Sequence, residues 1–109
     1  MNSLTAVDES NYADEVVESH QPVLIKFWAP WCGPCKMLDP VVETIAGERG
    51  KALKVVTLNV DEAPSLAAQN GVRGLPTVAL FKGGEKLDAL SGVQPKERFD
   101  ALLDGYIPR

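Results

Sequence analysis

The most reactive side chains in this sequence are its two cysteines, Cys32 and Cys35, which enclose Gly33 and Pro34. A small secreted scaffold would carry four or more cysteines spread along the chain, so this pair does not indicate a framework of structural disulfides. A structural zinc site needs four ligands, and the single histidine, His20, is distant in the sequence. A disulfide between the two cysteines would close so small a loop that it adds little stability. The spacing therefore predicts thiol–disulfide chemistry and no bound metal.

The position of the pair in the chain predicts different roles for the two thiols. The apolar run at residues 23–28 predicts a strand buried on both faces, and a helical pattern starts at about Pro34. Cysteines three apart on the first turn of a helix lie on the same side, close enough to form a disulfide. The unpaired N–H groups of a helix N-terminus stabilise a thiolate, so we expect the pKa of Cys32 to lie below its ordinary value. Cys32 should be the exposed thiol that attacks a client disulfide, and Cys35 the shielded thiol that resolves the mixed disulfide.

Short apolar runs alternate with amphipathic segments along the whole chain, without a linker or an internal repeat. Hydrophobic periodicity predicts strands at residues 4–7, 23–28, 52–60, 77–82 and 86–90. It predicts helices at about residues 10–19, 34–48, 63–70 and 95–106, the second of them kinked by Pro40. Gly83-Gly84, between the last two strands, is typical of a hairpin turn. This order predicts one α/β domain over residues 1–109, in which a mixed sheet has helices on both faces.

Composition and charge exclude several classes of function. Of the 109 residues, 45% are hydrophobic and 24% charged, which is ordinary for a globular domain. The 15 acidic and 11 basic residues leave a net charge of −4, and no run of Lys or Arg offers a patch for nucleic acid or an anionic membrane. No apolar stretch is long enough to span a bilayer, and residues 1–9 lack the features of a signal peptide. We therefore expect a cytoplasmic monomer without nucleic-acid or membrane partners.

Several short motifs, taken with their spacing, carry a resemblance to a known family. Trp31-Cys32-Gly33-Pro34-Cys35 lies between a predicted strand and a predicted helix, and Gly74-Leu75-Pro76-Thr77 follows about forty residues later. The other matching segments are Phe27-Trp28-Ala29, Lys36-Met37, Asn59-Val60-Asp61, Phe81-Lys82-Gly83-Gly84-Glu85 and Gly92. From about residue 5 to 107, the chain resembles the thioredoxin family.

This resemblance implies a fold, an activity and a set of site residues. The implied fold is a central mixed five-stranded sheet flanked by four helices, and the implied activity is the reduction of disulfides in client proteins through Cys32 and Cys35. A thioredoxin reductase, drawing on NADPH and flavin or on another donor, would restore the dithiol, with no metal or organic cofactor in the chain itself. A cis Leu75–Pro76 bond would face the dithiol and place the backbone of residue 75 beside a client strand. The residues implied to form the client groove are Trp31, Gly33, Pro34, Gly74, Leu75, Pro76, Gly92 and Val93.

Alternatives remain at the level of the sequence. A dithiol oxidase or isomerase would use the same cysteine pair, although the Gly33-Pro34 dipeptide and the lack of an export signal argue against it. A non-catalytic binding subunit with this fold would have no need of two reactive thiols. Trp28 is interpreted as a core aromatic residue, whereas Trp31, next to the cysteine at a strand end, is interpreted as functional.

The chain departs from the family at a charged position. Thioredoxins usually have a buried Asp on the central strand beneath the resolving cysteine and a Lys nearby on the next strand, but here these positions are Lys26 and Thr57. A lone buried ammonium is costly and needs a partner. Asp39, four residues after Cys35, would lie on the same helical face, so we predict that it pairs with Lys26 and takes the proton of Cys35. Alternatively, Lys26 extends to solvent and Asp39 is an ordinary surface residue.

Overall fold

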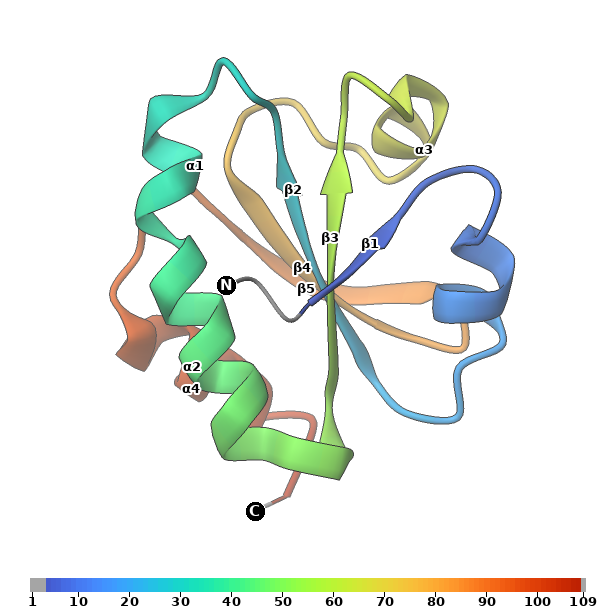
Figure 1. The fold of residues 1–109 in the computed structure, drawn as a ribbon. Coiled ribbons are helices and arrows are strands. Elements are labelled where there is room, and N and C mark those ends of the chain that lie inside the picture. Colours follow the sequence, from blue (N-terminus) through green and yellow to red (C-terminus); the bar gives the residue numbers. More distant parts are fainter. Residues whose placement is uncertain (1–3, 109) are drawn as a thin grey trace.

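A computed structural model describes residues 4–108, which form a five-stranded sheet with helices on both faces (Figure 1). In spatial order the strands are β1 (Thr5–Val7), β3 (Lys54–Asn59), β2 (Val23–Trp28), β4 (Thr77–Lys82) and β5 (Glu85–Ser91). Strand β3 runs parallel to β1 and β2, whereas β4 pairs antiparallel with β2 and β5. The predicted α/β fold is confirmed, with its parallel portion and its late antiparallel hairpin.

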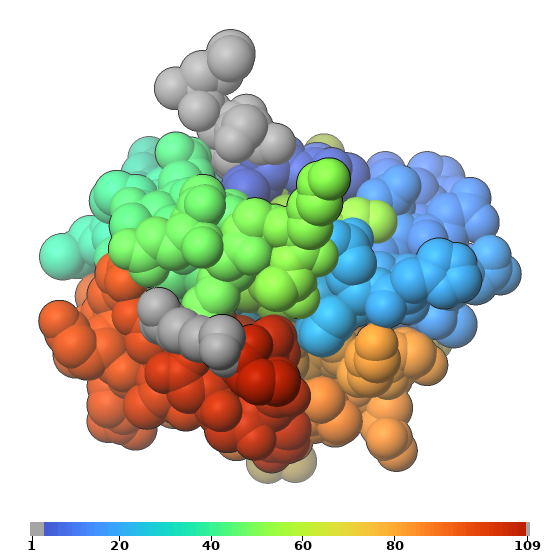
Figure 2. Space-filling view, turned by 90° about the horizontal axis from the view of Figure 1, so that it is seen from below, coloured from blue at the N-terminus to red at the C-terminus, as the bar shows by residue number. Residues whose placement is uncertain are grey.

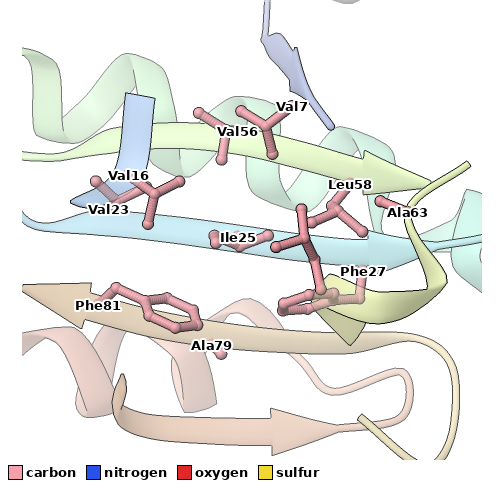
Figure 3. Close-up of a cluster of buried hydrophobic side chains, with 11 residues drawn as sticks. Val7, Val16, Val23, Ile25, Phe27, Val56, Leu58, Ala63, Ala79 and Phe81 are labelled. Atoms are coloured by element: carbon pink, nitrogen blue, oxygen red, sulfur yellow. The ribbon is translucent and has the colours of Figure 1, made fainter. Parts of the chain in front are cut away.

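The central strand β2 is buried on both faces, as its apolar run predicts. On one face Val23, Ile25 and Phe27 pack against a cluster that includes Val16 and Leu58 (Figure 3). On the other face Leu24 joins a second buried cluster, to which the helices contribute Leu38, Val42, Ile45, Phe99 and Leu103. Because side chains alternate along a strand, Lys26 lies on the same face as Leu24. The strand therefore directs its one charged side chain toward the layer of helices that carries Cys35.

Four α-helices surround the sheet (Figure 1). They are α1 (Gly33–Met37), α2 (Asp39–Arg49), α3 (Pro64–Gln69) and α4 (Lys96–Asp104). The helix predicted at residues 34–48 is thus two helices separated at Leu38. Pro40 has no N–H group and its ring would clash with the carbonyl one turn earlier, so it stands in the first turn of a new helix instead of bending a continuous one.

The first predicted helix, at residues 10–19, is present only in part and in a different form. A single π-helical turn, η1 (Ala13–Val17), is present there. The side chain of Asp8 accepts hydrogen bonds from Ser10, and that of Asn11 accepts one from the backbone of Asp8 at 2.8 Å. These bonds cap the start of the helical segment, where the backbone N–H of Tyr12 also donates to the carbonyl oxygen of Asp8 at 3.0 Å.

Helices α2 and α4 lie side by side on one face of the sheet, as the green and orange-red segments show in the view from below (Figure 2). The buried Arg49 of α2 bridges the two helices, because its Nη2 atom lies 3.1 Å from carboxylate oxygens of both Asp100 and Asp104. None of the helices in residues 4–108 has the length and apolarity that crossing a membrane requires. Helix α2 contacts both α4 and α1, so α1 is held against this layer of helices.

The hairpin between β4 and β5 turns at Gly83 and Gly84, as predicted. Both glycines have a positive φ, 60° and 84°, the conformation that a two-residue hairpin turn favours. A Cβ atom on Gly83 would meet open space, whereas one on Gly84 would lie 3.2 Å from a methyl carbon of Val17. Both glycines therefore need a positive φ, but only Gly84 also lacks space for a side chain.

We predict that Gly84→Ala lowers the free energy of unfolding by about 2–3 kcal/mol, because backbone strain and crowding of Val17 add together. Gly83→Ala, the matched control, carries the backbone strain alone and should cost about 1 kcal/mol. Urea unfolding followed by circular dichroism measures both values. Equal losses for the two variants would contradict the contribution of the Val17 contact.

Candidate active site

The cysteine pair lies where β2 ends and α1 begins. Cys32 is the N-cap residue of α1, and the backbone N–H of Cys35 donates a hydrogen bond to the Cys32 Sγ atom at 3.2 Å. The two residues form a disulfide, with their Cα atoms 5.4 Å apart. The first turn of the helix thus directs a backbone donor at the sulfur of Cys32, which is the sulfur predicted to carry the attacking charge.

Both cysteines are buried in this disulfide form. Cys32 is 5% exposed and Cys35 is 1% exposed. The prediction that Cys32 is an exposed thiol is therefore wrong, although the predicted order of exposure is correct. The burial arises because Ala29 packs with the pair, and the half-buried side chains of Trp28, Val60 and Leu75 cover it.

The loop at residues 74–77 lies against the cysteines and is tied to the turn after β5. The Leu75–Pro76 peptide bond is cis, as expected, and Leu75 packs against the cysteine pair. The Gly92 N–H donates to the carbonyl oxygen of Pro76 at 2.8 Å, and the hydroxyl of Thr77 donates to the carbonyl oxygen of Gly74 at 2.7 Å. These hydrogen bonds hold two loops that are distant in the sequence beside one disulfide.

Most of the remaining predicted groove residues are exposed at the surface, and together they are called the rim. Trp31 is 69% exposed and Val93 is 43% exposed. Gly33, Pro34 and Gly74 are also exposed, whereas Pro76 is buried. The interpretation of Trp31 as a surface residue next to the cysteines is consistent with this exposure.

A hollow of about 300 Å³ opens beside the rim, between Trp31 and α3. Its lining is Trp31, Val60, Pro64, Ala67, Ala68, Val72, Arg73, Gly74 and Leu75. The indole Nε1 of Trp31 lies 3.1 and 3.2 Å from the two carboxylate oxygens of Asp61, which orients the ring. No local sequence pattern assigns a role to Asp61 or to the α3 side of this hollow. Asp61 lies within a motif already noted, but only the folded chain brings it to the indole.

A second cavity, of about 280 Å³, lies behind the disulfide. Its lining is Lys26, Trp28, Cys35, Lys36, Asp39 and Thr57. Lys26 is only 3% exposed and forms an ion pair with the carboxylate of Asp39, whose side chain is 44% exposed. The predicted pairing is therefore present, and the alternative in which Lys26 extends to solvent is wrong.

Trp28 belongs to this second cavity as well as to the core. It is half-buried, and the Lys26 Nζ atom lies 5.9 Å from the centre of its ring. Its interpretation as a simple core aromatic is therefore incomplete, because the ring also supplies a π surface for the buried ammonium. Within residues 4–108 no group of three or more His, Cys, Asp or Glu side chains is arranged to hold a metal ion.

The disulfide lies at the start of a helix, directly after the central strand and beside a loop with a cis-proline. This arrangement defines the class of thiol–disulfide oxidoreductases. A sequence model of the thioredoxin family matches residues 3–105. The thioredoxin of Porphyra purpurea is 44% identical over 105 residues, which cover 96% of this chain and 98% of that protein. Thioredoxin 1 of Synechococcus elongatus is 45% identical over 107 residues, covering 98% and 100%. The chloroplastic M-type thioredoxin of Chlamydomonas reinhardtii is 45% identical over 102 residues, covering 94% and 73%.

The chain belongs to the thioredoxin family. Its activity is dithiol–disulfide reduction through the Cys32–Cys35 pair. Of the functions left open by the sequence, the family thus favours the reductase over the oxidase, the isomerase and the non-catalytic subunit.

We predict that removing only Asp39 from the Lys26–Asp39 ion pair lowers the free energy of unfolding more than removing both residues. Asp39→Ala leaves a buried ammonium without its carboxylate and should lower the free energy of unfolding by about 1–3 kcal/mol, less than for a fully buried pair because Asp39 is partly solvated. Lys26→Ala combined with Asp39→Ala leaves an uncharged pocket and should lose less than Asp39→Ala alone. Denaturant unfolding of the two single variants and the double variant measures the coupling. Simple addition of the two single losses would contradict a coupled pair.

Proposed function

We propose that Cys32 attacks the disulfide of a client protein and that Cys35 then resolves the mixed disulfide. The observation that carries this assignment is the hydrogen bond from the backbone of Cys35 to the Cys32 Sγ atom, which would stabilise negative charge on that sulfur. The greater exposure of Cys32 supports the same order of attack. In the first step a Cys32–client bond forms and the client disulfide breaks. In the second, the Cys35 thiolate attacks the Cys32 sulfur, which restores the intramolecular disulfide and releases the second client thiolate.

We propose that the client segment lies across the rim on Trp31, Gly33, Pro34, Gly74, Gly92 and Val93. Cys32 is only slightly exposed, so a client would have to present its cystine on an extended or flexible segment. The backbone of Leu75 would pair with that segment, and Pro76 would occupy the space beside the sulfurs. The apolar hollow between Trp31 and α3 would accept a side chain that neighbours the client cysteine.

A thioredoxin reductase is the proposed source of electrons, and proteins with reducible disulfides are the proposed clients. The chain would act as a monomeric single domain, because one sheet with a buried cluster on each face accounts for its core. We propose the cytoplasm as its location, since a dithiol donor functions where the surroundings keep thiols reduced.

Replacing Cys35 with Ser should trap clients as mixed disulfides with Cys32, because the resolving thiol is missing. The trapped adducts would be isolated from a lysate under non-reducing conditions and released by dithiothreitol. Cys32→Ser is the matched control and should trap none. Trapping by Cys32→Ser but not by Cys35→Ser would reverse the assigned roles.

Insulin reduction tests the proposed electron donor. We expect the protein to accelerate precipitation of the insulin B chain with dithiothreitol, and also with NADPH plus a flavin-containing thioredoxin reductase. Omitting the reductase or the NADPH provides the control for the second reaction. Activity with dithiothreitol but none with the complete NADPH system would show that the chain uses a different donor.

A further inference from the structure

The cavity behind the disulfide gives Cys35 a charged environment of its own. The ionisable groups that line it with Cys35 are Lys26 from β2, Lys36 from α1 and Asp39 from the first turn of α2, and β3 contributes the hydroxyl of Thr57. Asp39 is the one carboxylate lining this cavity among the described residues. Among the lining groups, the ionised carboxylate of Asp39 is therefore the one base that can accept a proton from the Cys35 thiol.

The two members of the ion pair differ in their access to solvent. Lys26 is almost fully buried, whereas the side chain of Asp39 is 44% exposed. Asp39 thus borders both the cavity that contains Cys35 and the bulk solvent. Cys35 and Asp39 line the same cavity of about 280 Å³, a volume sufficient for water.

We propose that Asp39 accepts the proton of Cys35 when this thiol becomes the resolving nucleophile, and that Lys26 is the positioning residue that holds Asp39 for this task. This inference rests on the proposed function, in which Cys35 resolves the mixed disulfide. The proton moves from the Cys35 Sγ atom to an Asp39 oxygen, directly or through one water. The thiolate then forms the bond to Cys32, the bond from Cys32 to the client breaks, and Asp39 releases its proton to solvent.

The ion pair explains how a partly exposed carboxylate stays at the cavity. An unrestrained Asp side chain on the surface would turn toward water, but the buried ammonium keeps one of its oxygens directed inward. The ring of Trp28, 5.9 Å from the Lys26 Nζ atom, supports the ammonium from another side. The arrangement spans β2 and α2, so the charge that serves Cys35 comes from the helix and not from the strand beneath it.

Stopped-flow mixing of the reduced protein with excess dithiobis(nitrobenzoate) separates the two chemical steps. Attack by Cys32 releases one yellow thionitrobenzoate at a rate that depends on the reagent concentration. Resolution by Cys35 releases a second one at a rate that does not. Loss of the second phase in Cys35→Ser verifies the assignment of the phases. If Cys35→Ser retained both phases, the proposed function would fail, whatever the role of Asp39.

Asp39→Asn should leave the first phase within about twofold of the parent protein and slow the second phase at least about tenfold at neutral pH. The difference between the second-phase rates of Asp39→Asn and the parent protein should narrow as the pH rises, because hydroxide can then remove the proton in place of the carboxylate. An effect of charge alone has the opposite sign, because an unpaired Lys26 ammonium would stabilise the Cys35 thiolate and speed the second phase. An unchanged or faster second phase in Asp39→Asn would overturn the proposal.

Three further variants test the geometry, and a fourth tests a general effect of charge. Asp39→Glu, which keeps the carboxylate, should recover most of the rate of the second phase. Lys26→Met should slow this phase, and Lys26→Met combined with Asp39→Asn should be no slower than Asp39→Asn alone, because Lys26 acts through Asp39. Glu43→Gln is the matched control, since it removes a charge from the same helix outside the cavity and should leave both phases unchanged. Equal slowing by Glu43→Gln, or independent multiplication of the Lys26 and Asp39 effects, would overturn the proposal.

Discussion

The burial of β2 on both faces is the constraint on which the rest of the structure depends. Val23, Ile25 and Phe27 are committed to one buried cluster and Leu24 to the other, so the strand can neither rotate nor shift by one residue without exposing them. The end of the strand therefore delivers the cysteine pair to a defined edge of the sheet. The same alternation places Lys26 under the helix that follows the pair, where a charge has few ways to be solvated.

A buried ammonium at that point requires a nearby anion, and the local helix geometry supplies it. Pro40 separates α1 from α2, so Asp39 stands in the first turn of a new helix, where the helix dipole favours a carboxylate. The departure from the family pattern is consequently not one isolated substitution. Lys26, Thr57 and Asp39 line one cavity, in which the ammonium stands on β2 and the carboxylate on α2. Cys35 thus remains next to a carboxylate, although this carboxylate belongs to a different element.

The two sides of the disulfide serve different purposes. On the outer side, an exposed rim around Trp31 and an apolar hollow beside α3 favour contact with a client of variable sequence. On the inner side, the cavity contains fixed charges and the less exposed sulfur. The apolar hollow and the inner cavity share no lining residue, so the client and the proton that we propose for Cys35 would use different sides of the pair. This separation suits a reaction in which the client and the proton leave by different routes.

The sequence by itself determined the chemistry of the cysteine pair, the sheet class and the hairpin at Gly83-Gly84. It indicated the pairing of Lys26 with Asp39 but left open that Lys26 extends to solvent, and the tertiary structure decided for the ion pair. These features depend on local spacing, on β and helical periodicity, and on the high cost of an unpaired buried charge. The resemblance to the thioredoxin family additionally predicted the cis bond before Pro76. Tertiary structure alone decided the burial of Cys32, the place of Trp28 in the inner cavity, and the hollow formed with α3. It also decided that the first predicted helix is a short π-helical segment, Ala13–Val17. Burial and cavities arise from side chains that are far apart in the sequence, so no local pattern of residues contains them.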